Sequence, residues 1–319
     1  MLRNRKVSII GDGAVGSTIA YTLFTHHTVN EIVIIDLNKK KAEGDVLDMI
    51  HGMSFVSPKI LKAGDYSDCK GSNIIVITAG VAQKEGETRQ DLLLKNVRVM
   101  DSIIESIKPY IDEHTIILMV TNPVDVLTYY VAHKLGIDKR RVIGSGTVLD
   151  TARLKSVIAD DTHIDPRNIH TFVIGEHGDS EVPTFSITTI GGLPIEDYCA
   201  RCGKCNNKNL VKMHQLHETV KNAAYEIISK KGATFYAVAL SVDKIIETIL
   251  NDQNSVLTVS TYVENEFDGR IKDVYMSLPC VVNSKGVEKI LRPKYNDYEI
   301  NKVVNSGKEL REKIELIIK

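Results

Sequence analysis

Two features of the sequence predict an α/β fold, with a doubly wound parallel sheet in the first half and a mixed α+β domain in the second. Short β-branched and apolar runs alternate with helical patterns up to residue 144. Beyond that point, strand-like runs follow one another or flank a pair of helices. Regular alternation of strand and helix is typical of a parallel sheet covered on both faces. We therefore divide the chain into a first domain, residues 1–144, and a second domain, residues 145–319.

The first half contains four near-continuous apolar runs, as expected for strands buried on both sheet faces. They cover residues 7–10, 31–35, 73–77 and 115–120. Residues 91–108 carry leucine, isoleucine, valine and methionine at helical spacing, which predicts an amphipathic helix. The chain therefore repeats a strand-and-helix unit rather than a hairpin unit.

The second half mixes both kinds of element. Helical patterns cover residues 209–231, 233–252 and 298–319. Strand-like runs are expected at 171–174, 182–190, 255–263, 274–282 and 287–291. Residues 283–286 read Asn-Ser-Lys-Gly, which predicts a hairpin turn between the last two strands.

The composition excludes several classes of partner. The 319 residues include 40 basic and 41 acidic side chains, so no strong field favours nucleic acid or an anionic membrane. The apolar run after the basic N-terminus is too short for a secretory signal, and no stretch has the length of a membrane span. We expect a cytoplasmic protein whose five cysteines are reduced thiols and whose partners are small molecules and other subunits.

A glycine-rich turn follows the first predicted strand and opens a helical run. Gly11, Gly13 and Gly16 fit the pattern GxGxxG, in which glycine permits a tight turn and close approach of backbone amides to a pyrophosphate. Asp36 ends the next strand twenty residues after Gly16, where a carboxylate would accept hydrogen bonds from a ribose diol and repel a 2′-phosphate. These features predict a Rossmann-type domain that binds NAD rather than NADP. The alternative is an ordinary strand-turn-helix in which Asp36 caps a helix.

Polar residues also follow two later strands. The loop at residues 79–91 contains two glycines and several charged residues, so it is placed either as a lid or as a solvated loop. Asn122 ends the fourth strand and precedes Pro123, which is either a cis proline that fixes the turn or simply the start of a helix. Asn122 could offer its amide to a substrate or to the nicotinamide ribose.

Asp150 and Arg153 lie three residues apart, so on a helix they share one face. They either point into a cleft together or form a surface ion pair. Gly175-Glu176-His177-Gly178-Asp179 follows an apolar strand and leaves three interpretations open for its histidine. These are an incidental residue in a turn, a metal site with Glu176 and Asp179, and an acid-base histidine that needs a carboxylate partner.

Taken together, these motifs resemble the lactate/malate dehydrogenase family, and within it the L-lactate dehydrogenases of the bacterial type. The resemblance extends over essentially the whole chain, in the family's order and spacing. It rests on the glycine-rich turn and on residues 83–89, 121–124, 149–153, 175–179 and 231–234.

The resemblance implies an NAD-dependent oxidoreductase that interconverts pyruvate and L-lactate. His177 would be the proton donor, Asp150 would orient its ring, and Arg89 would descend with the lid to polarise the carbonyl. Arg153 would bind the substrate carboxylate, and the implied pocket is completed by Gln83, Asn122 and Thr234. The cofactor would be held by Gly11, Gly13, Ala14, Val15, Gly16, Asp36, Thr78, Ala79, Gly80 and Asn122. No metal is implied, because Arg89 and Arg153 already supply the cations.

The residue that separates lactate from malate dehydrogenases would be Gln83. At this position, six residues before the lid arginine, malate dehydrogenases have an arginine for the second substrate carboxylate. With Gln83 a dicarboxylate would bring an unpaired charge into the closed pocket, whereas pyruvate brings a methyl group. Malate dehydrogenase or another 2-hydroxy acid dehydrogenase is the alternative within the family. A catalytically silent protein on the same fold is the alternative from another class. NAD-dependent glycosidases share the nucleotide-binding architecture but would need a metal-binding arrangement of cysteine and histidine, and the set of Arg89, Arg153, Asp150 and His177 argues against them.

The resemblance also implies assembly and regulation. Members are usually tetramers with roles in glycolysis and fermentation, and many bacterial ones are allosterically activated by fructose 1,6-bisphosphate through a histidine and an arginine. His170 matches the histidine, but Lys155 replaces the arginine and lacks its bidentate fork. Cys199, Cys202 and Cys205 form CxxCxxC without an evident fourth ligand, so ordinary thiols are the favoured interpretation.

Overall fold

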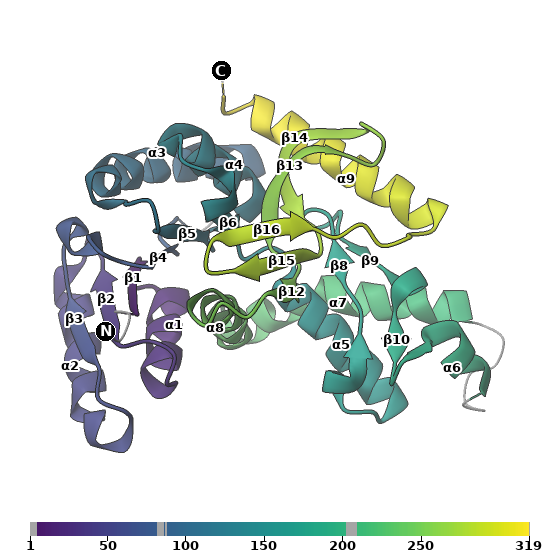
Figure 1. Cartoon of the computed structure of the whole chain (residues 1–319), viewed down its shortest axis with the longest axis horizontal. Coiled ribbons are helices and arrows are strands. Elements are labelled where there is room, and N and C mark those ends of the chain that lie inside the picture. The colour runs from purple at the N-terminus through teal and green to yellow at the C-terminus, as the bar shows by residue number, and fades with distance from the viewer. Residues whose placement is uncertain (1–4, 82–85, 87, 202–208, 319) are drawn as a thin grey trace.

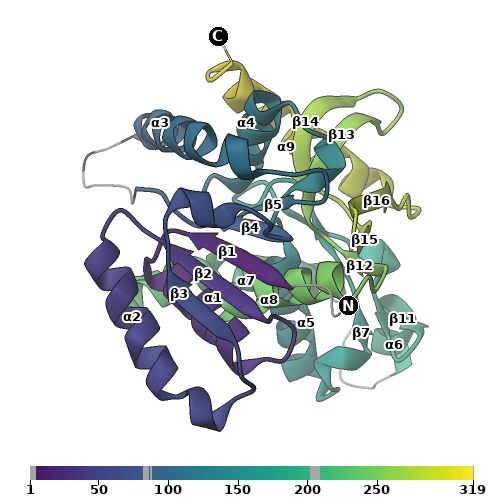
Figure 2. The same ribbon diagram turned by 60° about the vertical axis from the view of Figure 1, so that its left-hand side comes forward.

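A computed structural model describes residues 5–81, 86, 88–201 and 209–318. Its centre is an eight-stranded sheet in the order β14-β13-β6-β5-β4-β1-β2-β3 (Figures 1 and 2). The six strands from the first half are parallel to one another. They are β1 (Lys6–Ile10), β2 (Glu31–Ile35), β3 (Ile60–Ala63), β4 (Ile74–Ile77), β5 (Ile116–Met119) and β6 (Val142–Gly144).

The predicted doubly wound sheet is confirmed, because these strands are ordered 3-2-1-4-5-6. Every residue of β1, β4 and β5 is buried, which explains their continuous apolar sequence. β3 and β6 were not predicted, because β3 reads Ile-Leu-Lys-Ala and is partly exposed at the sheet edge, and β6 has only 3 residues. The helices of this half are α1 (Ala14–Thr25), α2 (Lys39–His51), α3 (Arg89–Ile107) and α4 (Val124–Leu135).

Two strands of the second half extend the same sheet, which the sequence did not predict. β13 (Ser260–Glu266) pairs antiparallel with β6 through Ser260 and Gly144, and β14 (Ile271–Ser277) pairs antiparallel with β13. The C-terminal helix α9 (Asp297–Glu315) shares one core cluster with both strands and with the parallel sheet. The division at residue 144 therefore stays a prediction, because packing is continuous across it.

A smaller body forms around α5 (Val148–Thr162) and a second apolar core, whose buried residues lie between positions 154 and 220. The predicted strands at 182–190, 255–263 and 274–282 are each interrupted, while the hairpin at residues 283–286 is confirmed by the pairing of Asn283 with Gly286. The remaining helices are α6 (Ile195–Arg201), α7 (Asn209–Lys231) and α8 (Tyr236–Leu250), and the buried apolar side chains of α8 belong to the main core. The strands are β7 (Ile169–His170), β8 (Val173–Ile174), β9 (Val182–Pro183), β10 (Thr189–Ile190), β11 (Leu193–Pro194), β12 (Ser255–Leu257), β15 (Cys280–Asn283) and β16 (Gly286–Ile290).

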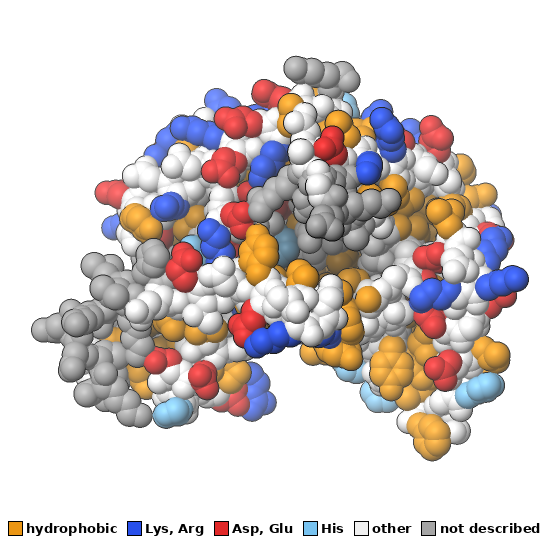
Figure 3. Space-filling model, turned by 180° about the vertical axis from the view of Figure 1, so that it is seen from behind, with side chains coloured by type: hydrophobic (Ala, Val, Ile, Leu, Met, Phe, Trp, Pro, Cys, Tyr) orange, Lys and Arg blue, Asp and Glu red, His pale blue; other side chains and the backbone are white. Residues whose placement is uncertain are grey.

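The surface agrees with the balanced charge of the sequence. Acidic and basic side chains are interspersed on the face seen in Figure 3, and neither sign covers a large area of it. Among the described residues, no helix combines the length and apolarity that a membrane crossing requires.

Candidate active site

The glycine-rich turn lies at the carboxyl end of β1, beside β4, where the strand order of the parallel sheet reverses. Dinucleotides bind at such a switch point in open α/β sheets. A Cβ atom on Gly11 would lie 2.6 Å from the Ala79 nitrogen, and one on Gly16 would lie 1.8 Å from the Gly11 carbonyl oxygen. A Cβ on Gly13 would meet no protein atom within 4 Å. Two glycines are therefore required by the protein itself, and the third leaves open space beside the N-terminus of α1.

The residues after β4 close this turn from the other side. Thr78 donates its hydroxyl to the carbonyl oxygens of Ile10 and Gly11, at 3.2 and 2.9 Å. Gly80 lies against Thr121, because a Cβ on Gly80 would be 2.4 Å from the Thr121 methyl carbon. The structure thus brings Thr78, Ala79 and Gly80 next to the glycine turn, while their role in cofactor binding stays a prediction.

Asp36 also lies at the turn, at the end of β2. Its Oδ2 accepts a hydrogen bond from the Asp12 backbone N–H at 2.6 Å, and its Oδ1 accepts from the Asn38 N–H at 2.7 Å. Lys41 contacts the buried Asp12 carboxylate, with Nζ 3.0 Å from Oδ2. Burial raises the pKa of Asp12 to about 6, although the contact with Lys41 opposes this shift. The glycine cradle and the fixed Asp36 carboxylate fit the pyrophosphate and ribose of NAD.

Asn122 lies at the end of β5, and the peptide bond before Pro123 is cis. The Asn122 carbonyl accepts a hydrogen bond from Asn96 Nδ2 at 3.0 Å, while Asn96 Oδ1 accepts from the Val81 N–H at 2.8 Å. The buried Asn96 side chain therefore connects the first residues after β4 to the turn after β5. Its role was missed by the sequence analysis, because Asn96 lies inside a helix that predicted only a packing face.

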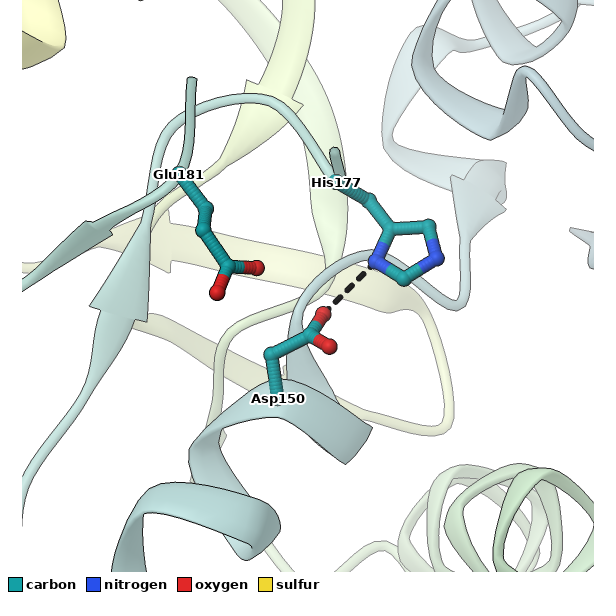
Figure 4. Close-up of side chains that lie close together, drawn as sticks. All are labelled: Asp150, His177 and Glu181. Atoms are coloured by element: carbon teal, nitrogen blue, oxygen red, sulfur yellow. Dashed lines mark hydrogen bonds and ion pairs between the residues drawn. The ribbon is translucent and has the colours of Figure 1, made fainter. Parts of the chain in front are cut away.

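The predicted pairing of His177 with Asp150 is present. His177 Nδ1 lies 2.6 Å from Asp150 Oδ2 (Figure 4), and Arg153 Nη1 donates to Asp150 Oδ1 at 2.8 Å. The Asp150 side chain is 3% exposed and that of His177 is 25% exposed. Since a carboxylate only accepts, Nδ1 carries a proton and Nε2 is left for a substrate. The alternative of a surface ion pair is wrong, because the side chains of Arg153 and Asp150 are only 13% and 3% exposed and their ion pair lies beside His177.

The charges of this cluster shift its proton affinities. Burial lowers the pKa of His177, but the Asp150 carboxylate outweighs this effect and raises the pKa to about 9. Burial also opposes ionisation of Asp150, yet His177 and Arg153 together hold its pKa below the ordinary value. The pair is therefore an imidazolium beside a carboxylate at neutral pH, which is the protonation state of a proton donor.

The backbone around His177 is fixed from two helices. The His177 N–H donates to Asp125 Oδ2 at 2.7 Å, from the first turn of α4. The Glu176 N–H donates to Ser306 Oγ at 2.8 Å, and Lys313 donates to the Glu176 carboxylate, both from α9. Glu176 thus contacts the C-terminal helix. Neither Asp125 nor Ser306 was predicted for this role, although an acid two residues after Pro123, among the apolar residues that begin α4, was a usable signal.

Some predicted residues are placed less completely. Gln83 lies outside the described residues, as do Cys202 and Cys205, and only the backbone of Arg89 is described, as the first residue of α3. Thr234 is half-buried just before α8, and Cys199 is half-buried in α6. His170 is exposed on β7, while Lys155 on α5 is half-buried, and burial lowers the pKa of its amine.

The structure brings together a different group of side chains from the metal site considered in the sequence. One oxygen each of Asp150 and Glu181 and one ring nitrogen of His177 lie within 4.8 Å of one another. Glu176 and Asp179 are not members, because Glu176 contacts α9 and Asp179 accepts a hydrogen bond from the Tyr225 hydroxyl at 3.1 Å. The sequence did not predict Glu181 as a neighbour of His177. Glu181 follows His177 by four residues, but within a loop this spacing does not determine whether two side chains point the same way.

A dinucleotide cradle together with a buried aspartate that contacts a half-buried histidine and arginine defines an NAD-dependent dehydrogenase. Comparison with known proteins agrees. Residues 5–144 match the NAD binding domain of the lactate/malate dehydrogenases, and residues 147–319 match their alpha/beta C-terminal domain. The chain belongs to the lactate/malate dehydrogenase family.

Several relatives are lactate dehydrogenases by name. The chain is 48% identical over 318 residues to L-lactate dehydrogenase 1 of Clostridium acetobutylicum, covering 99% of this chain and 100% of the relative. It is 48% identical to an L-lactate dehydrogenase of Acetivibrio thermocellus, over 98% of this chain and 97% of that one. Among solved structures, a lactate dehydrogenase from a Medee basin deep-sea metagenome superposes with a TM-score of 0.93, 40% identity and full coverage of both chains. The minor L-lactate dehydrogenase of Enterococcus mundtii gives a TM-score of 0.93 at 37% identity and 99% coverage of both.

Proposed function

We propose that this protein is an L-lactate dehydrogenase, which reversibly reduces pyruvate to L-lactate with His177 as the proton donor. The observation that carries the proposal is the buried His177–Asp150 pair with Arg153 on the same helix face. The relatives named as L-lactate dehydrogenases, which align over almost their full length, support the same reaction.

The proton and the substrate carboxylate are handled by separate groups. When bound, NADH supplies the hydride that adds to the substrate carbonyl carbon. His177 Nε2–H meets the developing charge on the carbonyl oxygen, and Asp150 stabilises the ring while it is charged. Among the described residues, Arg153 makes no hydrogen bond other than that to Asp150, so Nε and Nη2 can serve the substrate carboxylate. Arg89 polarises the carbonyl, and Asn122 and Thr234 complete the pocket.

Pyruvate rather than oxaloacetate is the proposed substrate, because Gln83 supplies no cation for a second carboxylate. NADH oxidation should be measured with a panel of 2-oxo acids, and pyruvate should give the highest kcat/KM. A His177→Asn variant should bind NADH normally and lose most turnover. Absence of turnover with every 2-oxo acid would instead support a catalytically silent protein, and a preference for oxaloacetate would support a malate dehydrogenase.

The proposed assembly is a homotetramer. Large apolar side chains are exposed on and after α2, where Leu47 is 55% and Phe55 is 89% exposed, and on α8, where Tyr236 is 67% exposed. Hydrophobic side chains gather along the indented lower edge of the face in Figure 3. Apolar surface of this kind favours contact between subunits. Sedimentation equilibrium tests the proposal, and a monomer at micromolar concentration would contradict it.

Fructose 1,6-bisphosphate is a candidate effector at His170 and Lys155. Burial lowers the pKa of Lys155, and lysine lacks the bidentate geometry of arginine, so any activation should be small. Pyruvate saturation curves with and without the bisphosphate test this.

We further propose a cytoplasmic enzyme that regenerates NAD in glycolytic fermentation.

A further inference from the structure

Glu181 is a buried acid that the proposed reaction does not use. It precedes β9 and is only 6% exposed. Among the described residues, no hydrogen-bond partner reaches its Oε1 atom, which is itself inaccessible to solvent. A buried carboxyl group without a donor is costly when ionised. Its position close to Asp150 and His177 therefore points to a role in their chemistry.

The carboxyl group of Glu181 points toward the catalytic pair. Figure 4 shows it directed at the space beside Asp150 and His177, and one of its oxygens lies within 4.8 Å of an Asp150 oxygen and of a His177 ring nitrogen. Both oxygens of Asp150 already have partners, namely His177 and Arg153. Asp150 therefore acts on Glu181 mainly as a nearby negative charge, and two buried carboxylates this close do not both ionise easily.

We propose that Glu181 is a positioning residue that sets the proton affinity of His177 by its own protonation. The neutral carboxylic acid adds no charge, so His177 releases its proton to the substrate more readily. The ionised form stabilises the imidazolium and adds a second negative charge to a pocket that must accept a substrate carboxylate. This inference rests on the proposed reaction, in which His177 donates the proton.

The charges facing Glu181 support a neutral acid at neutral pH. Burial, followed by the charge of Asp150, raises the pKa of Glu181 to about 8, while His177, Arg153 and Lys221 oppose the shift. Glu181 also faces a cavity of about 560 Å³ between α7 and α9. The other titratable groups lining that cavity are Asp179, Glu196, His217, Glu218, Tyr298, Glu299, Lys302 and Glu309.

The histidine and the glutamate then titrate as a coupled pair. Each proton lost from Glu181 makes the next proton, on His177, harder to remove. In the native enzyme, the ionised Glu181 should therefore shift the alkaline decrease in kcat/KM for pyruvate to higher pH. A neutral residue at position 181 should abolish that shift.

The test is the pH profile of kcat/KM for pyruvate in native protein and in Glu181→Gln, which keeps the size of the side chain and removes its ionisation. We expect the apparent alkaline pKa to fall by roughly one unit, the usual effect of a nearby charge on a buried group. Oxamate is an analogue of pyruvate that keeps the carboxylate and has an amino group in place of the methyl group. The pH dependence of its binding to the complex of protein and NADH should shift by the same amount. A merely structural role would change the rate without moving either profile.

Glu218→Gln serves as the matched control, because Glu218 lines the same cavity from an exposed position on α7. Its profile should superimpose on that of the native enzyme. If thermal melting shows that Glu181→Gln does not fold, Glu181→Ser provides a second neutral variant with room for water. A folded neutral variant with an unshifted profile would overturn the inference, whereas a native protein without pyruvate reduction would overturn the proposed reaction instead.

Discussion

His177 Nδ1 lies 2.6 Å from Asp150 Oδ2, although the two residues are 27 positions apart in the sequence. Asp150 fixes which ring nitrogen carries the structural proton, and so assigns the other nitrogen to the substrate. The same contact gives His177 a pKa of about 9, well above the ordinary 6.5. The pair thereby determines both the direction and the pH range of proton transfer.

Pyruvate reduction and lactate oxidation should depend on pH in opposite ways. Reduction requires protonated His177, so its kcat/KM should stay level through neutral pH and fall as pH rises through about 9. Oxidation requires the neutral ring and should rise over the same interval. Initial rates in both directions with saturating cofactor would test this, and a reduction profile that already falls near pH 6.5 would contradict it.

Asp150→Asn should lower kcat/KM for pyruvate roughly 10²–10⁴-fold, the usual contribution of general acid-base catalysis. The amide can donate to Nδ1 and stabilise the wrong tautomer, and it no longer stabilises the imidazolium. NADH affinity, measured by fluorescence titration, should stay unchanged because Asp150 lies outside the glycine cradle. Asp160→Asn, on an exposed position of the same helix, is the control and should retain native rates.

Gly16→Ala and Gly13→Ala should fail for different reasons. The added Cβ on Gly16 would lie 1.8 Å from the Gly11 carbonyl oxygen, so the turn must distort and the melting temperature of the cofactor-free protein should fall. The Cβ on Gly13 meets no protein atom within 4 Å, so the protein should remain stable but bind NADH less tightly. Equal loss of thermal stability in both variants would show that the protein, not the cofactor, requires Gly13.

Asp125→Ala should destabilise the loop that carries His177. It removes the acceptor of the His177 N–H in a buried place, at a cost of about 1–3 kcal/mol. Burial raises the pKa of Asp125 to about 6, so its charge is already disfavoured and Asp125→Asn, which keeps an acceptor oxygen, should cost less. Urea unfolding of both variants measures the difference, and identical free energies of unfolding would remove this role from Asp125.

Gln83→Arg should raise oxaloacetate reduction relative to pyruvate reduction, because the guanidinium would pair with the second carboxylate. The relevant measurement is the ratio of kcat/KM for the two substrates in native and variant protein. Gln83→Met, which adds no charge, is the matched control. An unchanged ratio in Gln83→Arg would place substrate selection elsewhere in the pocket.

Local patterns predicted the parts of the site that lie on single elements. The glycine turn follows β1 directly, and helical periodicity placed Asp150 and Arg153 on one face. The contacts that support His177 come instead from α4 and α9, and Ser306 is 130 positions from Glu176. No spacing rule relates residues so far apart, because their distance is set by how whole elements pack.

The sequence by itself determined the alternating strands and helices, the dinucleotide turn and the identity of the acid-base histidine with its aspartate and arginine. Those features depend on periodicity, on backbone freedom at glycine and on motifs of a few residues. Only the tertiary structure decided that β13 and β14 complete the first sheet, that Asp125 holds the His177 backbone and that Glu181 faces the catalytic pair. The physical reason is that burial and proton affinity depend on neighbours supplied by remote segments, whose positions follow from the packing of the shared core.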